Sequence, residues 1–171
     1  MKRNQKGSNK AKEILEQIGF DEITELSMEE LIAGFDIIYM EEELNGSDGK
    51  IIRGKSKTII KVDANISTIE RKRFVAAHEL GHFFLHDRLE FHLDNEKSLS
   101  WNRLEETYKK GVQEIEANDF AGELLMPDKV FKDFIAGKSF GPNLIRETSE
   151  RFNTSLTSVI FRMLTLDIAP F

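Results

Sequence analysis

The sequence contains one His-Glu-x-x-His pattern, which constrains this chain more than any other feature. The pattern is His78-Glu79-Leu80-Gly81-His82, inside a segment with helical character. Residues at i and i+4 of a helix lie one above the other on the same face, so both imidazoles can reach one metal ion. Glu79 would then lie beside the ion, where it can act as a base on a water molecule. The pattern therefore predicts a metal site on a helix.

The composition restricts both the ligands and the partners. There are no cysteines and four histidines, all between His78 and His92, so a metal here must use histidine and carboxylate ligands. The net charge of −6 does not favour binding to nucleic acid or to an anionic membrane. We find no signal-peptide pattern and no apolar run of membrane-spanning length, and the expected location is the cytoplasm.

The pattern of apolar and turn residues predicts one α+β domain. A polar, basic stretch over residues 1–9 is expected to be a disordered tail, with a single domain over residues 10–171. Three β-rich segments separated by turn signals predict a small antiparallel three-stranded sheet, at about residues 36–62. We expect this sheet to pack on a helical bundle.

The remaining segments favour helices. A capping box at Ser27, followed by Glu30, predicts a short helix before the sheet, and a second one at Ser67 opens the metal helix, at about residues 68–86. Residues 87–112 are polar and are expected to form a loop with a short helix. The other helical segments are expected at about residues 11–18, 113–125 and, in the C-terminal part, 129–171.

A catalytic zinc site normally has three protein ligands, and the sequence leaves the third one open. His86 and His92 are candidates, but His86 continues the face of His78 and His82 along the same straight helix, so it cannot easily complete a tetrahedron. Other candidates come from the expected helix at 113–125, namely Glu114, Glu116 and Glu123. Helix geometry alone does not choose among these carboxylates.

Two stretches together identify a family resemblance. Residues 73–86 (RFVAAHELGHFFLH) and 116–127 (EANDFAGELLMP) resemble the ImmA/IrrE family of metallopeptidases, and the likeness covers roughly residues 27–136. The resemblance implies a zincin-like (gluzincin-type) metallopeptidase core and a zinc-dependent endopeptidase, with Zn²⁺ held by His78, His82 and Glu116. It also implies a regulatory protein as substrate, such as an Xre-type helix-turn-helix repressor.

The motif and the proposed ligand set suggest further roles and alternatives. Glu79 would accept a proton from the attacking water and deliver it to the leaving amine. Mn²⁺ or Fe²⁺ could also occupy a site of two histidines and one carboxylate. Residues that could stabilise the oxyanion or orient a ligand are His86, His92, Tyr108 and Asn118.

Two other functions compete with the peptidase. Residues 144–162 have the rhythm of a helix-turn-helix, but residues 142–171 carry as many acidic residues as arginines, which argues against DNA binding. The other alternative is a regulatory module with a non-catalytic metal site. The intact Glu79 argues against it, because a structural zinc site needs no base.

Overall fold

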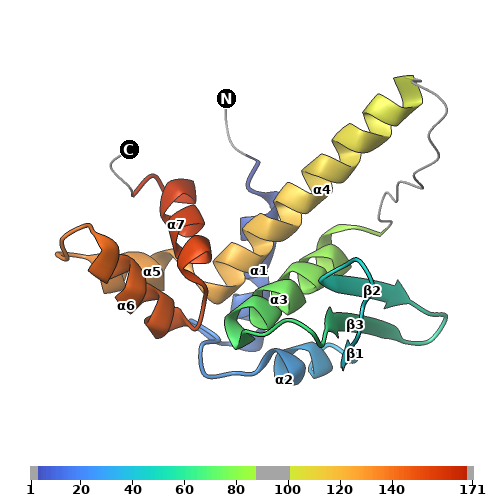
Figure 1. Ribbon diagram of the computed structural model, residues 1–171, viewed down its shortest axis with the longest axis horizontal. Coiled ribbons are helices and arrows are strands. Elements are labelled where there is room, and N and C mark those ends of the chain that lie inside the picture. Colours follow the sequence, from blue (N-terminus) through green and yellow to red (C-terminus); the bar gives the residue numbers. More distant parts are fainter. Residues whose placement is uncertain (1–3, 88–100, 169–171) are drawn as a thin grey trace.

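The computed structural model describes residues 4–87 and 101–168, without the side chains of residues 101–108. Its elements follow the order α1 (Lys6–Ile18), α2 (Met28–Ala33), β1 (Ile37–Glu42), β2 (Gly49–Arg53), β3 (Thr58–Asp63), α3 (Ile69–Leu85), α4 (Trp101–Leu125), α5 (Asp128–Ile135), α6 (Pro142–Phe152) and α7 (Leu156–Thr165). The fold is α+β, as the sequence predicts. The sheet lies at one end of the molecule, α1, α3 and α4 occupy the middle, and α5–α7 form the other end (Figure 1).

The middle of the molecule is a three-helix layer in which α4 contacts both α1 and α3. Leu80 of α3 and Phe120 of α4 are fully buried in the core between these helices. Gly81 allows the close approach, because a Cβ at this position would lie 3.0 Å from Cδ1 of Phe120. The glycine within the His-Glu-x-x-His pattern therefore sets how near α4 comes to the two histidines.

The sheet is mixed, so the prediction of an antiparallel sheet was wrong. Its strand order is β1-β3-β2, with β1 parallel and β2 antiparallel to β3. A tight turn joins β2 to β3, whereas the connection after β1 crosses the end of β3. This order puts Ile60 and Val62 of β3 in the middle, where both are fully buried, while Ile38 and Met40 of the edge strand β1 stay partly exposed.

Strand β2 is tied to the end of the metal helix by one side chain. The guanidinium of Arg53 donates hydrogen bonds to the backbone oxygens of His82, Phe83 and His86, at 3.1, 3.1 and 2.7 Å. The oxygen of His82 also accepts from the backbone N–H of His86, and all three carbonyls lie at the C-terminal end of α3, where a helix leaves carbonyls short of intrahelical partners. This edge strand is thereby held along α3.

The predicted disordered tail over residues 1–9 was wrong for residues 6–9, which form the first part of α1. Gly7 is buried against α4, and a Cβ there would lie 2.1 Å from the backbone oxygen of Glu116. The polar composition of this stretch hides the contact, because the residue that packs is a glycine and not an apolar side chain.

Helix α4 begins at Trp101, so the expected loop over residues 87–112 was wrong for the helical residues 101–112. Residues 88–100 lie outside the described residues. Polar helical turns carry no apolar stripe by which the sequence could reveal them. The capping box at Ser27 is confirmed, including both reciprocal hydrogen bonds with Glu30. The one at Ser67 was wrong, because Thr68 is the N-cap of α3 and makes no side-chain capping bond.

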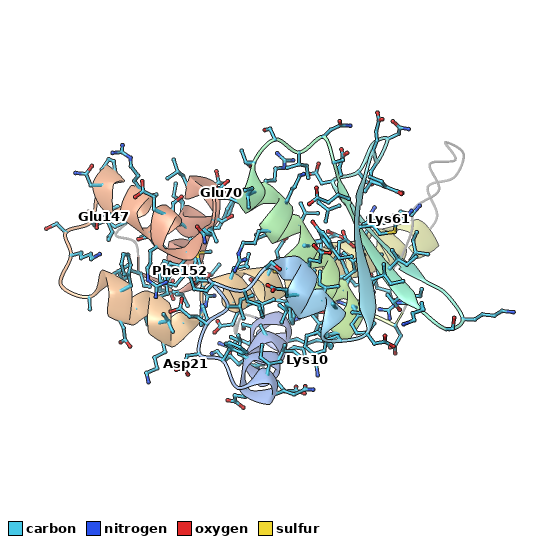
Figure 2. All side chains as sticks on the ribbon, turned by 90° about the horizontal axis from the view of Figure 1, so that it is seen from below. Lys10, Asp21, Lys61, Glu70, Glu147 and Phe152 are labelled. Carbon is cyan, nitrogen blue, oxygen red and sulfur yellow. The ribbon has the colours of Figure 1, made fainter. Side chains whose placement is uncertain are left out.

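The C-terminal helices enclose a second core, formed by Met126, Phe131, Leu144, Phe152, Val159 and Met163. Figure 2 shows Phe152 at the opposite end of the molecule from Lys61 of the sheet. Arg162 joins this part to α4, since it forms a buried ion pair with Glu123 and donates to the backbone oxygen of Met126 at 2.9 Å. Among the described helices, none is both long and apolar enough to cross a membrane.

Candidate metal centre

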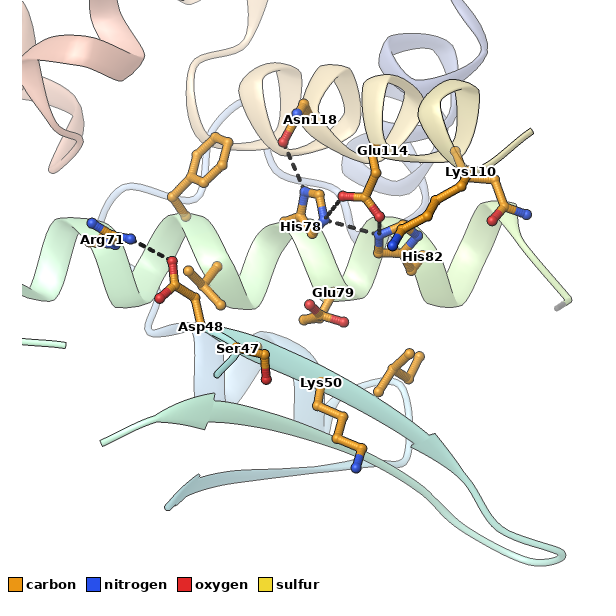
Figure 3. A pocket seen from close by; sticks show the side chains of 15 residues that line it. Ser47, Asp48, Lys50, Arg71, His78, Glu79, His82, Lys110, Glu114 and Asn118 are labelled. Atoms are coloured by element: carbon orange, nitrogen blue, oxygen red, sulfur yellow. Dashed lines mark hydrogen bonds and ion pairs between the residues drawn. The ribbon is translucent and has the colours of Figure 1, made fainter. Parts of the chain in front are cut away.

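Three side chains from two helices converge beside α3. The Nε2 atoms of His78 and His82 lie 3.0 Å apart, and the two carboxylate oxygens of Glu114 lie 3.2 and 3.4 Å from them (Figure 3). One ligand atom of each residue lies within 4.8 Å of those of the other two. Two imidazole nitrogens and a carboxylate are the donor set of many mononuclear zinc sites, so these residues fit a metal ion.

The other nitrogen of each histidine is also engaged. Nδ1 of His78 lies 2.9 Å from Oδ1 of Asn118, and Nδ1 of His82 lies 2.9 Å from Nδ1 of His86. Because an amide oxygen only accepts, Nδ1 of His78 carries the proton and its Nε2 keeps a lone pair. Asn118 thus contacts His78, one of the histidines that the sequence predicts as a ligand.

The carboxylate beside the two histidines is Glu114, and the structure does not place Glu116 there. Glu116 is buried on another side of α4, with Oε2 2.9 Å from Nε2 of His86 and 3.0 Å from Nζ of Lys6. Successive residues of a helix turn by about 100°, so positions two apart point about 200° away from each other. The carboxylate that lies beside the histidine pair is therefore Glu114, and not the Glu116 that the family resemblance implies as a ligand.

Glu79 lies between α3 and strand β2, next to the histidine pair (Figure 3). Its side chain is 8% exposed. Burial raises the pKa of its carboxyl, although the neighbouring His78 and His82 lower it in part. A carboxylate with a raised pKa is a better proton acceptor near neutral pH. Gly49 of β2 makes room for it, because a Cβ there would lie 2.8 Å from Oε1 of Glu79.

These side chains open into a groove of about 700 Å³ between α3, α4 and β2. Its polar lining residues include Lys50 and Lys110, and Asp48 and Arg71 form an ion pair of 2.5 Å at its wall. Strand β2 is an edge strand of the sheet, and its residues Gly49, Lys50 and Ile51 line the groove. The cluster is therefore accessible to a molecule much larger than water.

A second groove of about 370 Å³ adjoins the first between α4 and α7. Phe74 and Asn118 line both grooves. Its lining also includes Ile115 and Phe161, which are 58% and 62% exposed. An extended chain leaving the histidine cluster on this side would therefore meet an apolar surface.

The remaining predicted site residues do not join the cluster in the part of the chain that is described. His86 is buried and contacts Glu116 and Nδ1 of His82, and not the Nε2 atoms at which His78 and His82 meet. His92 lies outside the described residues, and Tyr108 lies in α4 with a side chain outside them. The sequence offered Glu114 only as one of several carboxylates, and no motif signalled the role of Gly49.

The fold and this side-chain cluster are those of a candidate metalloenzyme core. Residues 33–164 match the family profile Peptidase_M78, described as the IrrE N-terminal-like domain. Because this match covers most of the chain, the protein belongs to that family, as the resemblance in the sequence predicts.

Two curated relatives and one solved structure resemble the chain. It is 30% identical over 98 residues to "Metallopeptidase ImmA" of Bacillus subtilis strain 168, covering 57% of this chain and 52% of that one. It is 36% identical over 80 residues to "Uncharacterized immunity region protein 2" of Bacillus phage phi105, covering 47% and 45%. A "Mycobacterium tuberculosis transcriptional regulator" shares the fold, with a TM-score of 0.63, 19% identity and 91% and 46% coverage. The chain thus spans about half the length of these proteins.

Proposed function

We propose that this chain is a zinc-dependent endopeptidase that cleaves a regulatory protein. The observation that carries the proposal is the convergence of His78, His82 and Glu114 in an open groove beside the buried Glu79. A purely structural metal site needs no buried carboxylate that is left out of the ligand set. The membership of the Peptidase_M78 family supports the same function.

The proposed ligands are Nε2 of His78, Nε2 of His82 and the carboxylate of Glu114. Zn²⁺ suits two neutral imidazoles and one carboxylate, although Mn²⁺ or Fe²⁺ could bind the same set. When bound, the ion supplies a Lewis acid that makes a water molecule more acidic and polarises the scissile carbonyl.

Glu79 is the proposed proton carrier. It accepts a proton from the attacking water as the oxygen bonds to the carbonyl carbon. It then delivers this proton to the amide nitrogen as the C–N bond breaks, which leaves a carboxyl and an amine end. Its raised pKa favours both transfers near neutral pH, because the carboxylate must first gain and then lose a proton.

The shape of the site supports a polypeptide substrate. The groove beside Glu79 continues past Phe74 and Asn118 into the apolar groove, so several consecutive residues of a chain fit along it. We propose that apolar side chains of the substrate occupy the second groove. The family resemblance favours a repressor of the helix-turn-helix type as the natural substrate.

A comparison of wild type with Glu79→Gln tests this function. Both proteins are loaded with Zn²⁺ and incubated with a peptide library made from a bacterial proteome, and new N-termini are identified by mass spectrometry. We expect wild type to generate new N-termini that a chelator abolishes. Glu79→Gln should keep its zinc and lose about 10²–10⁴-fold of the rate.

Two outcomes would contradict the peptidase. If zinc-loaded wild type generates no new N-termini, or if Glu79→Gln generates the same ones at the same rate, the chain is better described as a module with a non-catalytic metal site. Zinc content measured on both proteins shows whether the cluster was loaded in each experiment.

A further inference from the structure

The N-terminal segment reaches the metal centre through a buried carboxylate. Nδ2 of Asn4 donates to Oε1 of Glu116 at 2.8 Å, and Nζ of Lys6 donates to Oε2 at 3.0 Å. Lys6 also approaches the backbone oxygen of Leu85, at the end of α3, at 3.4 Å. Asn4 and Lys6 precede the part of the chain that matches the family, which begins at residue 33.

From Glu116 a chain of hydrogen bonds leads to the histidine pair. Oε2 of Glu116 lies 2.9 Å from Nε2 of His86, and Nδ1 of His86 lies 2.9 Å from Nδ1 of His82. A carboxylate only accepts, so Nε2 of His86 carries the proton. In a neutral imidazole the other nitrogen then accepts, so Nδ1 of His82 is the donor. Nε2 of His82 is left with its lone pair toward His78 and Glu114.

This chain of contacts is buried and closely fitted. Glu116 is 6% and His86 5% exposed, so each depends on its protein partners for hydrogen bonding. Gly7 brings α1 against the backbone of α4 at Glu116, where no other residue would fit without a shift. That contact holds Lys6 and Asn4 within reach of the carboxylate.

We propose that His86 and Glu116, held by Lys6 and Asn4, are positioning residues that fix the tautomer and ring orientation of His82. The start of α1 is thereby part of the metal centre. This inference rests on the proposed metal site of His78, His82 and Glu114. At other metal sites, mutation of a partner that orients a ligand histidine typically lowers metal affinity about 10–100-fold.

The first test measures zinc affinity by competition with a chromophoric chelator. We expect His86→Leu and Glu116→Leu to bind Zn²⁺ about 10–100-fold more weakly than wild type. His86→Gln should recover part of the loss, because an amide can accept from His82 and donate to Glu116. Lys6→Met should weaken binding by a smaller factor.

Lys10→Met is the matched control for Lys6→Met. It removes the same charge from the same helix, but Lys10 pairs with Glu13 on the surface, at 2.8 Å. We expect its zinc affinity to equal that of wild type. Thermal unfolding of each metal-free variant separates a loss of affinity from a loss of fold.

The second test reads the tautomers directly in the wild-type protein, so its main result does not depend on a variant that could misfold. In ¹⁵N spectra of zinc-loaded wild type, with only four histidines to assign, His86 should carry its proton on Nε2 and His82 on Nδ1. The spectrum of Glu116→Gln, which keeps an acceptor oxygen, should show the same tautomers.

Several results would overturn the inference. Zinc affinities of His86→Leu and Glu116→Leu within twofold of wild type would do so, as would a His86 proton on Nδ1. If Glu116→Leu loses zinc entirely while Glu114→Leu keeps it, Glu116 is itself a ligand. If wild type itself binds no metal, the proposed function is overturned instead. Weak binding by the variants alone would not overturn that function.

Discussion

Glu114 and Glu116 are two residues apart in α4, yet their carboxylates serve different histidines. Glu114 lies 3.2 Å from Nε2 of His78 and 3.4 Å from Nε2 of His82, whereas Glu116 lies 2.9 Å from Nε2 of His86. The first carboxylate faces the open groove, and the second is enclosed between α1, α3 and α4. One can therefore bind an ion directly, while the other acts through a histidine.

This division predicts the metal content of two variants. Glu114→Ala should lose zinc, since two histidines alone hold the ion weakly. Glu116→Ala should still bind about one ion per chain when zinc is in large excess, because all three ligands remain. Elemental analysis after removal of free zinc decides between them. If Glu116→Ala loses zinc and Glu114→Ala keeps it, the ligand set implied by the family resemblance is right.

Gly49→Ala should disturb the general base without touching a ligand. The new Cβ would lie 2.6 Å from Cγ1 of Val75 and 2.8 Å from Oε1 of Glu79, so Glu79 or strand β2 must move. We expect peptide cleavage to fall, zinc content to stay unchanged and the free energy of unfolding to drop by about 1–3 kcal/mol. Cleavage assays and urea unfolding test this expectation.

Gly111→Ala is the control for Gly49→Ala. Its Cβ would meet no atom within 4 Å, and it lies in α4, where alanine favours the helix. Cleavage by this variant should match wild type. Equal cleavage by Gly49→Ala and wild type would show that β2 does not confine Glu79.

Gly122→Leu should fill the apolar groove and leave the fold intact. A Cβ at this position in α4 meets only Cδ of Arg162, at 4.0 Å, so a larger side chain projects into the groove. We expect kcat/KM to fall for peptides with large apolar residues beside the cleaved bond, with zinc content unchanged. Gly122→Ala is the size control and should cleave normally. If Gly122→Leu also cleaves normally, the substrate does not use this groove.

The ion pair between Glu22 and Arg151 should make stability depend on pH. The guanidinium of Arg151 donates two hydrogen bonds to Glu22, at 2.6 and 2.8 Å, and hydrogen bonding from Arg151 is the main reason that the pKa of Glu22 is lowered. A carboxyl with a lower pKa in the folded state stabilises the fold above its unfolded pKa of about 4.3. That contribution is lost as the pH falls through the folded value.

Glu22→Gln measures this contribution. At pH 7 we expect the variant to be less stable than wild type by about 0.2–1 kcal/mol, because the pair is partly exposed. The difference should vanish in acid, and urea unfolding from pH 7 down to pH 3 tests it. In an Arg151→Met background the substitution should have little effect at any pH. A pH-independent difference would contradict the electrostatic explanation.

Local patterns in the sequence predicted the parts of the site that lie on one element. The spacing of His78 and His82 needs only the geometry of a helix, and the structure brings their Nε2 atoms together. The capping box at Ser27 likewise depends on a few neighbouring residues. Most helix and strand positions followed from the same short-range signals.

Contacts between elements were decided by the tertiary structure. Strand order was one such case, because β1 and β2 both carry apolar residues that could pair beside β3. In the structure β2 and β3 contact α3, whereas β1 contacts α2. The length of α4 was another, since its polar first turns carry no apolar pattern. The role of α1 depended on Gly7, a residue whose lack of a side chain leaves no periodic signal.

The sequence by itself determined that this chain carries two stacked histidines with a glutamate between them, and that its metal ligands had to be histidines and carboxylates. Only the tertiary structure decided that Glu114 completes the cluster while Glu116 supports His82 through His86. The physical reason is the rotation of α4. Its angle about its own axis is fixed by packing against α1 and α3, and that angle selects which carboxylate faces the groove.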